Sequence, residues 1–127
     1  KRQTLEYETK TVMISVNPEL FSRLLVNLVS NAYRYGRENG HIRVRLWQED
    51  SSLVLSVADD GIGIARNEQE KIFRRFYQAD ASRGGEGTGL GLAMVYEIAR
   101  FYHGTVTVES VVDQGSTFVV RMPAGQS

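Results

Sequence analysis

The spacing of apolar and polar residues along the chain predicts a series of short strands separated by helices. Strands are predicted where apolar side chains alternate with polar ones or form a short apolar run. These segments are residues 11–16, 42–46, 53–57, 106–108 and 118–122. Polar residues at Glu49–Ser52 and Asp113–Gly115 turn the chain between neighbouring segments. Two hairpins are therefore predicted.

A long helix is predicted after the first strand. Asn17 supplies an N-cap, and Pro18 suits the first helical position because its missing N–H has no intrahelical partner there. The apolar residues that follow keep helical spacing to about Tyr35. Gly36 is expected to stop the helix in a left-handed conformation.

Two further helical segments complete the predicted order. A helical patch carries Ile72, Phe73 and Phe76, and a longer helix runs from about Gly89 to His103, where Gly104 ends it. The predicted order is β-α-β-β-α-α-β-β, with more hairpins than parallel crossovers. This favours an α/β two-layer sandwich, a mixed sheet with its helices on one face.

The first predicted helix carries amide side chains on its apolar face. Its apolar stripe consists of Leu20, Leu24, Leu25, Leu28, Ala32 and Tyr35. Asn31 falls inside this stripe, Asn27 lies at its edge and Arg34 just beyond it. A buried amide without partners costs roughly 1–3 kcal/mol. Either Asn31 bonds a neighbouring backbone group, or the row of amides and guanidinium binds a metal ion and phosphate.

An acidic, glycine-containing corner follows the third predicted strand. A carboxylate at a strand end, here Asp59, can accept a hydrogen bond from the exocyclic amine of a ligand, and Gly61 and Gly63 would let a base approach the backbone. The same residues are ordinary turn formers. Both readings remain open from these residues alone.

Residues 84–92 form a glycine-rich segment that opens the last predicted helix. The segment has the glycine spacing of a P-loop, but Leu90 stands where the phosphate-binding lysine belongs. The Gly61–Gly63 corner likewise lacks the third glycine of a dinucleotide fingerprint. Free N–H groups at a helix start bind anions without lysine, so phosphate binding is favoured here over a flexible linker.

Composition narrows the classes of function. The chain has 127 residues, 15 basic and 15 acidic side chains, and no cysteine. This suits one domain without disulfides, thiolate metal sites or a charge footprint for nucleic acid. No apolar run approaches the roughly 18 residues of a membrane-spanning helix, so a soluble domain without direct membrane contact is expected. The chain lacks an initial methionine, which suggests a fragment of a longer protein, with residues 1–127 as one domain.

Several other side chains have simpler interpretations. His41 follows a glycine turn, and His103 is expected in the last turn of a helix, where a cation complements the dipole. Trp47, Phe73 and the aromatic residues that follow Phe73 are interpreted as packing of the core or of a lid. None of these is a candidate for chemistry.

Taken together, these segments resemble the catalytic ATP-binding domain of bacterial sensor histidine kinases, within the gyrase and heat-shock chaperone ATPase superfamily. The resemblance covers about residues 11–123. The matching boxes are N (27–35), G1 (Asp59, Gly61, Gly63), F (72–77), G2 (87–92) and G3 (115–118). Asp113 stands where the family often has glycine, and aspartate tolerates a left-handed turn.

The resemblance implies a metal and phosphate end of the site. Asn31, helped by Asn27, would hold Mg²⁺, and Arg34 would contact phosphate. Gln78 and Arg83, in the segment that would form a lid, would reach the metal and the phosphates. Asn31, Arg34 and Arg83 would act in catalysis. The G2 residues that would surround the phosphates are Gly87, Thr88, Gly89, Leu90 and Gly91.

The resemblance also implies an adenine end. Asp59 would bind the adenine amine, with Thr117 nearby through water, and Tyr35 would lie against the base. The remaining residues implied at this end are Gly61, Gly63 and Ile64. The implied fold is the Bergerat-type two-layer sandwich, which agrees with the order predicted above.

The implied function is histidine autokinase activity in two-component signalling, with ATP and Mg²⁺ as cofactors. The partners would be the dimerisation and histidine phosphoacceptor domain of the same protein and, downstream, a response regulator receiver domain. The fragment would be a cytoplasmic domain of a sensor anchored in the inner membrane, and it lacks the acceptor histidine.

Rival functions remain, and one of them, a nucleotide-sensing or interaction module, is not an enzyme. An ATP-hydrolysing relative would carry a glutamate base where this chain has Asn27, and asparagine takes no proton at neutral pH. A serine kinase that binds a transcription factor is disfavoured by the F box.

Overall fold

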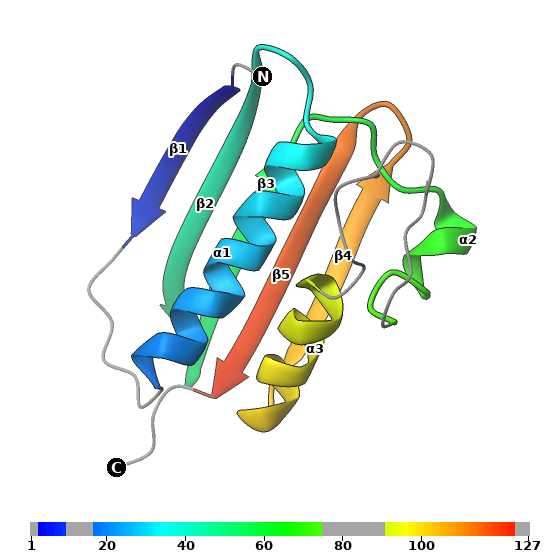
Figure 1. Cartoon of the computed structure of the whole chain (residues 1–127). Helices are drawn as coiled ribbons and strands as arrows, with labels where there is room; N and C mark the ends of the chain where they lie inside the picture. Colours follow the sequence, from blue (N-terminus) through cyan, green and yellow to red (C-terminus); the bar gives the residue numbers. More distant parts are fainter. Residues whose placement is uncertain (1–2, 10–16, 75–90, 124–127) are drawn as a thin grey trace.

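The computed structural model describes residues 3–9, 17–74 and 91–123, which form a twisted sheet with helices on one face (Figure 1). The elements are β1 (Gln3–Thr9), α1 (Pro18–Tyr35), β2 (Gly40–Glu49), β3 (Ser52–Asp59), α2 (Arg66–Gln69), α3 (Gly91–Phe101), β4 (Thr105–Val111) and β5 (Gly115–Pro123). The strand order is β1-β2-β3-β5-β4. Among the strands in the described residues, only the β1–β2 pair is parallel. The predicted two-layer α/β sandwich is confirmed.

The core lies between the sheet and the pair α1 and α3. Alternate residues of each strand face the helices, so that Val44 of β2, Val57 of β3 and Val120 of β5 are all buried. Leu24 and Leu28 of α1 meet this layer with no exposed surface. None of the helices in the described ranges is long and apolar enough to cross a membrane.

Helix α1 begins as predicted but ends differently. The Asn17 Oδ1 accepts hydrogen bonds from the N–H groups of Glu19 and Leu20, at 2.8 and 3.1 Å. Gly36 was expected in the left-handed region, but its backbone is extended, with φ −76° and ψ 172°. The Tyr35 carbonyl instead accepts a bond from the N–H of Ile62, so tertiary contacts end the helix.

The other two helices are shorter than predicted. The helical patch expected around Ile72 and Phe73 is replaced by α2, which ends at Gln69, and by turns. Helix α3 ends at Phe101, so the expectation that His103 lies in its last turn is wrong. His103 adopts φ 63°, and the Gly104 N–H reaches back to the Ala99 carbonyl, because this left-handed residue reverses the chain.

The edge strand β1 was not predicted. It pairs with β2 over all seven residues from Gln3 to Thr9, although its sequence is largely polar. Leu5, one of its few apolar residues, is 54% exposed. An edge strand with little buried surface carries a weak apolar pattern, which explains the omission. The strand predicted at 11–16 lies outside the described residues.

The face of the sheet opposite the helices, called here the outer face, carries exposed polar and charged side chains on β2 and β4, while Val54 and Ser56 of β3 are buried on it. Trp47 lies on it, half-buried, so the assignment of Trp47 to core or lid packing is wrong. Leu46 takes the inward position, and the alternation of the strand sends Trp47 outward. The Arg45 guanidinium lies 5.0 Å from the centre of the indole ring, a cation–π contact.

Candidate functional site

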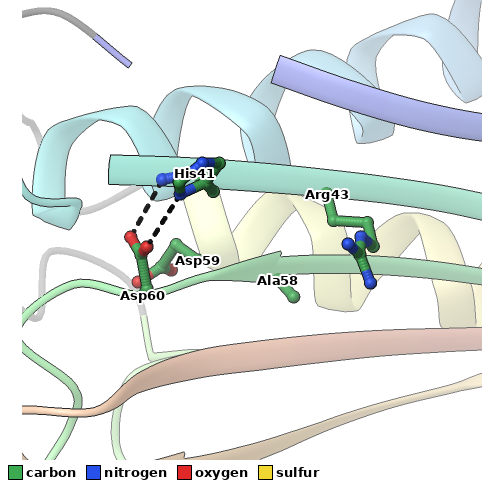
Figure 2. A pocket seen from close by; sticks show the side chains of 5 residues that line it. All are labelled: His41, Arg43, Ala58, Asp59 and Asp60. Atoms are coloured by element: carbon green, nitrogen blue, oxygen red, sulfur yellow. Dashed lines mark hydrogen bonds and ion pairs between the residues drawn. The ribbon is translucent and has the colours of Figure 1, made fainter. Parts of the chain in front are cut away.

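The end of β3 sends two neighbouring carboxylates to opposite faces of the sheet. Asp59 pairs with Ile42 of β2, and Ile42 is a buried core residue, so the register places Asp59 on the helix-covered face. Ala58 pairs with Arg43, which is exposed on the outer face. Asp60 follows Asp59 and bonds to His41 on that outer side (Figure 2). Of the two carboxylates, Asp59 is therefore the one beside α1.

The G1 corner, residues 59–64, packs tightly against the end of α1. The Ile62 N–H donates to the Tyr35 carbonyl at 3.1 Å. A Cβ on Gly61 would lie 2.0 Å from that same carbonyl oxygen, so no other residue fits there. The Asp59 Oδ1 accepts a hydrogen bond from the Gly61 N–H at 2.8 Å. This bond forms the ordinary turn that the sequence offered as the alternative to a binding site. Asp59 can therefore form this turn and also take part in a binding site.

Gly63 joins the same corner to the β4–β5 turn. Its φ is +73°, and a Cβ would lie 2.2 Å from the Val111 carbonyl oxygen. The Asp113 N–H donates to the Ile62 carbonyl at 2.8 Å. Asp113 itself adopts φ 68°, which confirms that aspartate takes a left-handed turn here. Both glycines of the corner are therefore required by internal packing, with or without a ligand.

The predicted residues of α1 line one edge of the helix next to α3. Asn27 and Asn31 are half-buried, while Arg34 is exposed and Tyr35 half-buried. A Cβ on Gly91, at the start of α3, would lie 3.5 Å from the Asn27 Oδ1. The Asn27 amide oxygen therefore faces the point where the glycine-rich segment enters α3. Gln78, Arg83 and the G2 residues Gly87, Thr88, Gly89 and Leu90 lie outside the described residues.

The structure does not bring Thr117 to Asp59. Thr117 pairs with Ala58 on the outer face, whereas Ser116 pairs with Asp59 and is only 7% exposed. Ser116 shares the helix-covered face with Phe118, two positions along β5. The alternation with Phe118 was visible in the sequence and indicated Ser116 as the hydroxyl on the Asp59 side.

Arg37 is a second residue that the sequence pattern did not reveal. Its Nε donates to the Asp60 carbonyl, and its Nη2 donates to the Asp113 carbonyl. One guanidinium thus ties the segment after α1 to the G1 corner and to the β4–β5 turn. An arginine in a polar loop carries no periodic signal, so only the structure could assign this contact.

A pocket of about 430 Å³ lies on the outer face, lined by His41, Arg43, Ala58, Asp59 and Asp60 (Figure 2). The His41 N–H donates to the Asp60 Oδ1 at 3.0 Å, and its ring Nδ1 lies 3.3 Å from Oδ2. Burial by itself raises the pKa of Asp60, but these hydrogen bonds with His41 outweigh it and lower the pKa below its ordinary value. The pocket shares Asp59 with the corner beside α1, but neither Asn27 nor Asn31 lines it.

The α1 edge suits a metal-bound phosphate chemically. Mg²⁺ takes hard oxygen ligands and is usually bound together with substrate phosphates. Asn27 and Asn31 offer two amide oxygens one helical turn apart, and Arg34 adds a guanidinium. Within the described residues, no group of three or more His, Asp or Glu side chains could hold a metal ion. The described part of this edge therefore fits a metal that arrives with a ligand's phosphates.

Comparisons with known proteins agree with this arrangement. The chain is 36% identical over 121 residues to the circadian input-output histidine kinase CikA of Synechococcus elongatus. The alignment covers 94% of this chain and 16% of CikA. The mycobacterial sensor histidine kinase MprB superimposes with a TM-score of 0.88 at 25% identity, covering 98% of this chain and 86% of that one. Full-length ShkA in complex with AMPPNP has a TM-score of 0.84 at 26% identity, and the superposition covers 98% of this chain and 26% of the ShkA chain.

These relatives and the family profile assign the chain. The chain spans only 16% and 24% of the length of the first two curated relatives it matches. The profile described as histidine kinase-, DNA gyrase B-, and HSP90-like ATPase matches residues 16–126. The chain therefore belongs to the family of histidine kinase-, DNA gyrase B- and HSP90-like ATPases.

Proposed function

We propose that this chain is the ATP-binding catalytic domain of a sensor histidine kinase. It binds Mg-ATP and donates the γ-phosphoryl group to a histidine on a separate dimerisation domain. One observation carries the proposal: the end of α1, the G1 corner and the start of β5 meet at Tyr35, Gly61 and Asp59. Three segments far apart in sequence thus build one edge of a site.

At the adenine end, Asp59 accepts a hydrogen bond from the exocyclic amine. Its Oδ1 is held by the Gly61 N–H, so the carboxylate is oriented before the nucleotide arrives. Ser116 lies opposite Asp59 and takes the water-linked role first assigned to Thr117. Tyr35 and Ile64 are half-buried beside the same corner and supply apolar contact to the base.

At the phosphate end, Asn27 and Asn31 hold Mg²⁺ through their amide oxygens. The metal, when bound, neutralises charge on the phosphate oxygens. Arg34 contacts the phosphates from the next turn of α1. Gln78 and Arg83, from the segment that would form a lid, and the G2 residues of the glycine-rich segment complete this end. The structure of full-length ShkA in complex with AMPPNP supports an ATP-like ligand for this fold.

Transfer to a histidine is favoured over hydrolysis by the identity of one residue. A hydrolytic site needs a base to deprotonate water, and asparagine at position 27 takes no proton at neutral pH. In the transfer, an imidazole nitrogen of the acceptor attacks the γ-phosphorus, and the bond to the β-phosphate oxygen breaks to release ADP. Positioning and charge neutralisation supply the catalysis.

The partners follow from this function. The acceptor histidine lies on a dimerisation domain of the same protein, and a response regulator receiver domain takes the phosphoryl group next. The relatives are sensor kinases much longer than this chain, which supports a multidomain parent protein. We place the domain in the cytoplasm, as part of a membrane-anchored sensor.

Incubation with γ-labelled ATP tests the function. The chain alone is expected to bind Mg-ATP by calorimetry but to release little labelled phosphate and to label no residue of its own. Addition of the dimerisation domain of the parent protein should yield an acid-labile, base-stable phosphoprotein, the signature of phosphohistidine. Rapid phosphate release by the chain alone would favour the ATPase rival, and an acid-stable product would favour the serine kinase.

The metal assignment has its own test. Asn31→Asp keeps the shape of the side chain but adds a charge near the phosphates. We expect normal melting with altered Mg-ATP affinity, whereas Asn39→Asp, at an exposed turn position, should change neither. An Asn31→Asp variant that melts normally and binds Mg-ATP like the parent would remove Asn31 from the metal site.

A further inference from the structure

The Ser110 hydroxyl lies at the centre of a hydrogen-bond network beside the G1 corner. Its Oγ is 2.7 Å from the Ile64 nitrogen, 2.8 Å from the Gly115 carbonyl oxygen and 2.8 Å from the Ser116 Oγ. Ser110 and Ser116 are directly opposite each other in the β4–β5 pair. Ser110 therefore touches both the end of the corner and the first residues of β5.

Counting hydrogens assigns the direction of each bond. Ser110 has one hydroxyl hydrogen, and the Ile64 N–H can only donate. When Ser110 donates to the Gly115 carbonyl, its oxygen accepts from both the Ile64 N–H and the Ser116 hydroxyl. The single Ser116 hydroxyl hydrogen is then used on Ser110, so toward any other group the Ser116 oxygen can only accept.

Gln69, just before α2 gives way to turns, completes the network. Its Nε2 donates to the Ile64 carbonyl at 2.9 Å and to the Ser110 carbonyl at 3.1 Å. Both backbone groups of Ile64 are thus held by side chains, the N–H by Ser110 and the carbonyl by Gln69. Partly buried bonds of this kind fix the backbone that carries them.

We infer that Ser110 and Gln69 are positioning residues for the adenine end of the site. Both side chains hold Ile64, the last residue of the G1 corner, and Ser110 also bonds to the hydroxyl of Ser116, which is paired with Asp59. The inference rests on the proposed function, because it assigns the two residues a part in selecting the base.

Selectivity for the base separates this role from a purely structural one. Inosine triphosphate carries an oxygen where ATP carries the exocyclic amine, so the ratio of the two affinities reports how well Asp59 and Ser116 are placed. A variant that only lowers the folded fraction weakens both nucleotides by the same factor. A displaced corner reduces the preference for ATP.

The experiment measures Mg-ATP and Mg-ITP affinity by calorimetry, and melting temperature, for two variants of the full chain. Ser110→Ala removes the hydroxyl, and Gln69→Glu replaces both donated bonds with an acceptor. Each is expected to lower the ATP-to-ITP affinity ratio by roughly threefold to tenfold, the range of one net hydrogen bond. Ser110→Thr keeps the hydroxyl and should restore the parent ratio.

Two control variants match these changes. Thr107→Val removes an exposed hydroxyl from the same strand, and Gln48→Glu adds the same charge at an exposed position of β2. Neither should change the ratio. Parent-like ratios in both Ser110→Ala and Gln69→Glu, in a chain that binds ATP, would overturn the inference. A parent chain that binds neither nucleotide would overturn the proposed function instead.

Discussion

Asp59 and Asp60 are identical neighbours at the end of one strand, yet they face different regions of the molecule. Asp59 lies on the helix-covered face, bonded to the Gly61 N–H and opposite the buried Ser116. Asp60 lies on the outer face, bonded to the backbone and ring of His41 (Figure 2). The pleat of the strand alone separates them. Adjacent residues of one type therefore have independent roles.

The same division runs along the whole sheet. On the helix-covered face, Phe118 is 2% exposed. Its ring packs edge to face against that of Phe73, with the ring centroids 6.1 Å apart.

On the outer face, Arg121 and Glu49 form an exposed ion pair at 3.4 Å, and the Arg45 guanidinium lies over Trp47. Exposed ion pairs contribute little free energy of folding, although Val54 on this face is fully buried. The helix-covered face therefore supplies most of the buried core.

The largest expected difference between the faces is in stability. Phe118→Ala should lower the free energy of unfolding by about 3–5 kcal/mol, because it opens a cavity in the core. Val119→Ala, on the outer face of the same strand, should cost no more than about 1 kcal/mol. Urea unfolding measures both. Equal losses would show that the outer face is packed as tightly as the inner one.

A smaller difference is expected in nucleotide affinity. Asp59→Asn replaces an acceptor with a group that also presents donors toward the adenine amine, and should weaken Mg-ATP binding by about 1–3 kcal/mol. Asp60→Asn makes the same chemical change on the other face and should leave the affinity unchanged. Calorimetric titration of both variants compares them. The reverse ranking would move the base-binding carboxylate to Asp60.

The smallest expected difference is in how the free energy of unfolding depends on pH. The folded state lowers the pKa of Asp60 from its ordinary value of 3.8, since hydrogen bonds with His41 outweigh burial. The resulting stability is fully present above that pH and is lost as the pH falls through the folded pKa. Because the pair is exposed, its contribution should stay under about 1 kcal/mol.

Stability curves between neutral and acid pH check this contribution. Asp60→Asn should flatten the acid limb slightly relative to the parent chain. Asp50→Asn, at an exposed turn position, removes the same charge and serves as the control. An Asp60→Asn variant with an unchanged acid limb would contradict the assigned role of the His41 bonds.

Much of the fold was predictable because local signals agreed with it. The Asn17–Pro18 cap, the apolar stripe of α1, the alternation of β2 and the hairpin of β2 with β3 each correspond to the structure. The end of α1 was wrong at Gly36, because the partner of the Tyr35 carbonyl is Ile62, far along the chain. Strand β1 was missed because its stability comes from pairing with β2.

The residues of the candidate site also differ in how far the sequence could predict them. Asn27, Asn31 and Asp59 were predicted from their positions on a helix face and at a strand end, which depend only on local periodicity, and their roles stay predictions. Ser116 was passed over for Thr117, although alternation with Phe118 indicated it. Arg37 has no such pattern, since it acts through backbone groups of distant segments. Ser110 continues the alternation of Val106 and Val108, but its bonds to Ile64 and Ser116 depend on tertiary structure.

The sequence by itself determined the order of elements, the two-layer class and the residue types available for ATP chemistry, because periodicity and motif spacing are written in neighbouring residues. Tertiary structure decided which carboxylate lies beside α1, which hydroxyl stands opposite it, and how the G1 corner is held. Those outcomes depend on strand register and on hydrogen bonds between segments far apart in the chain. Their energies arise only when the segments meet.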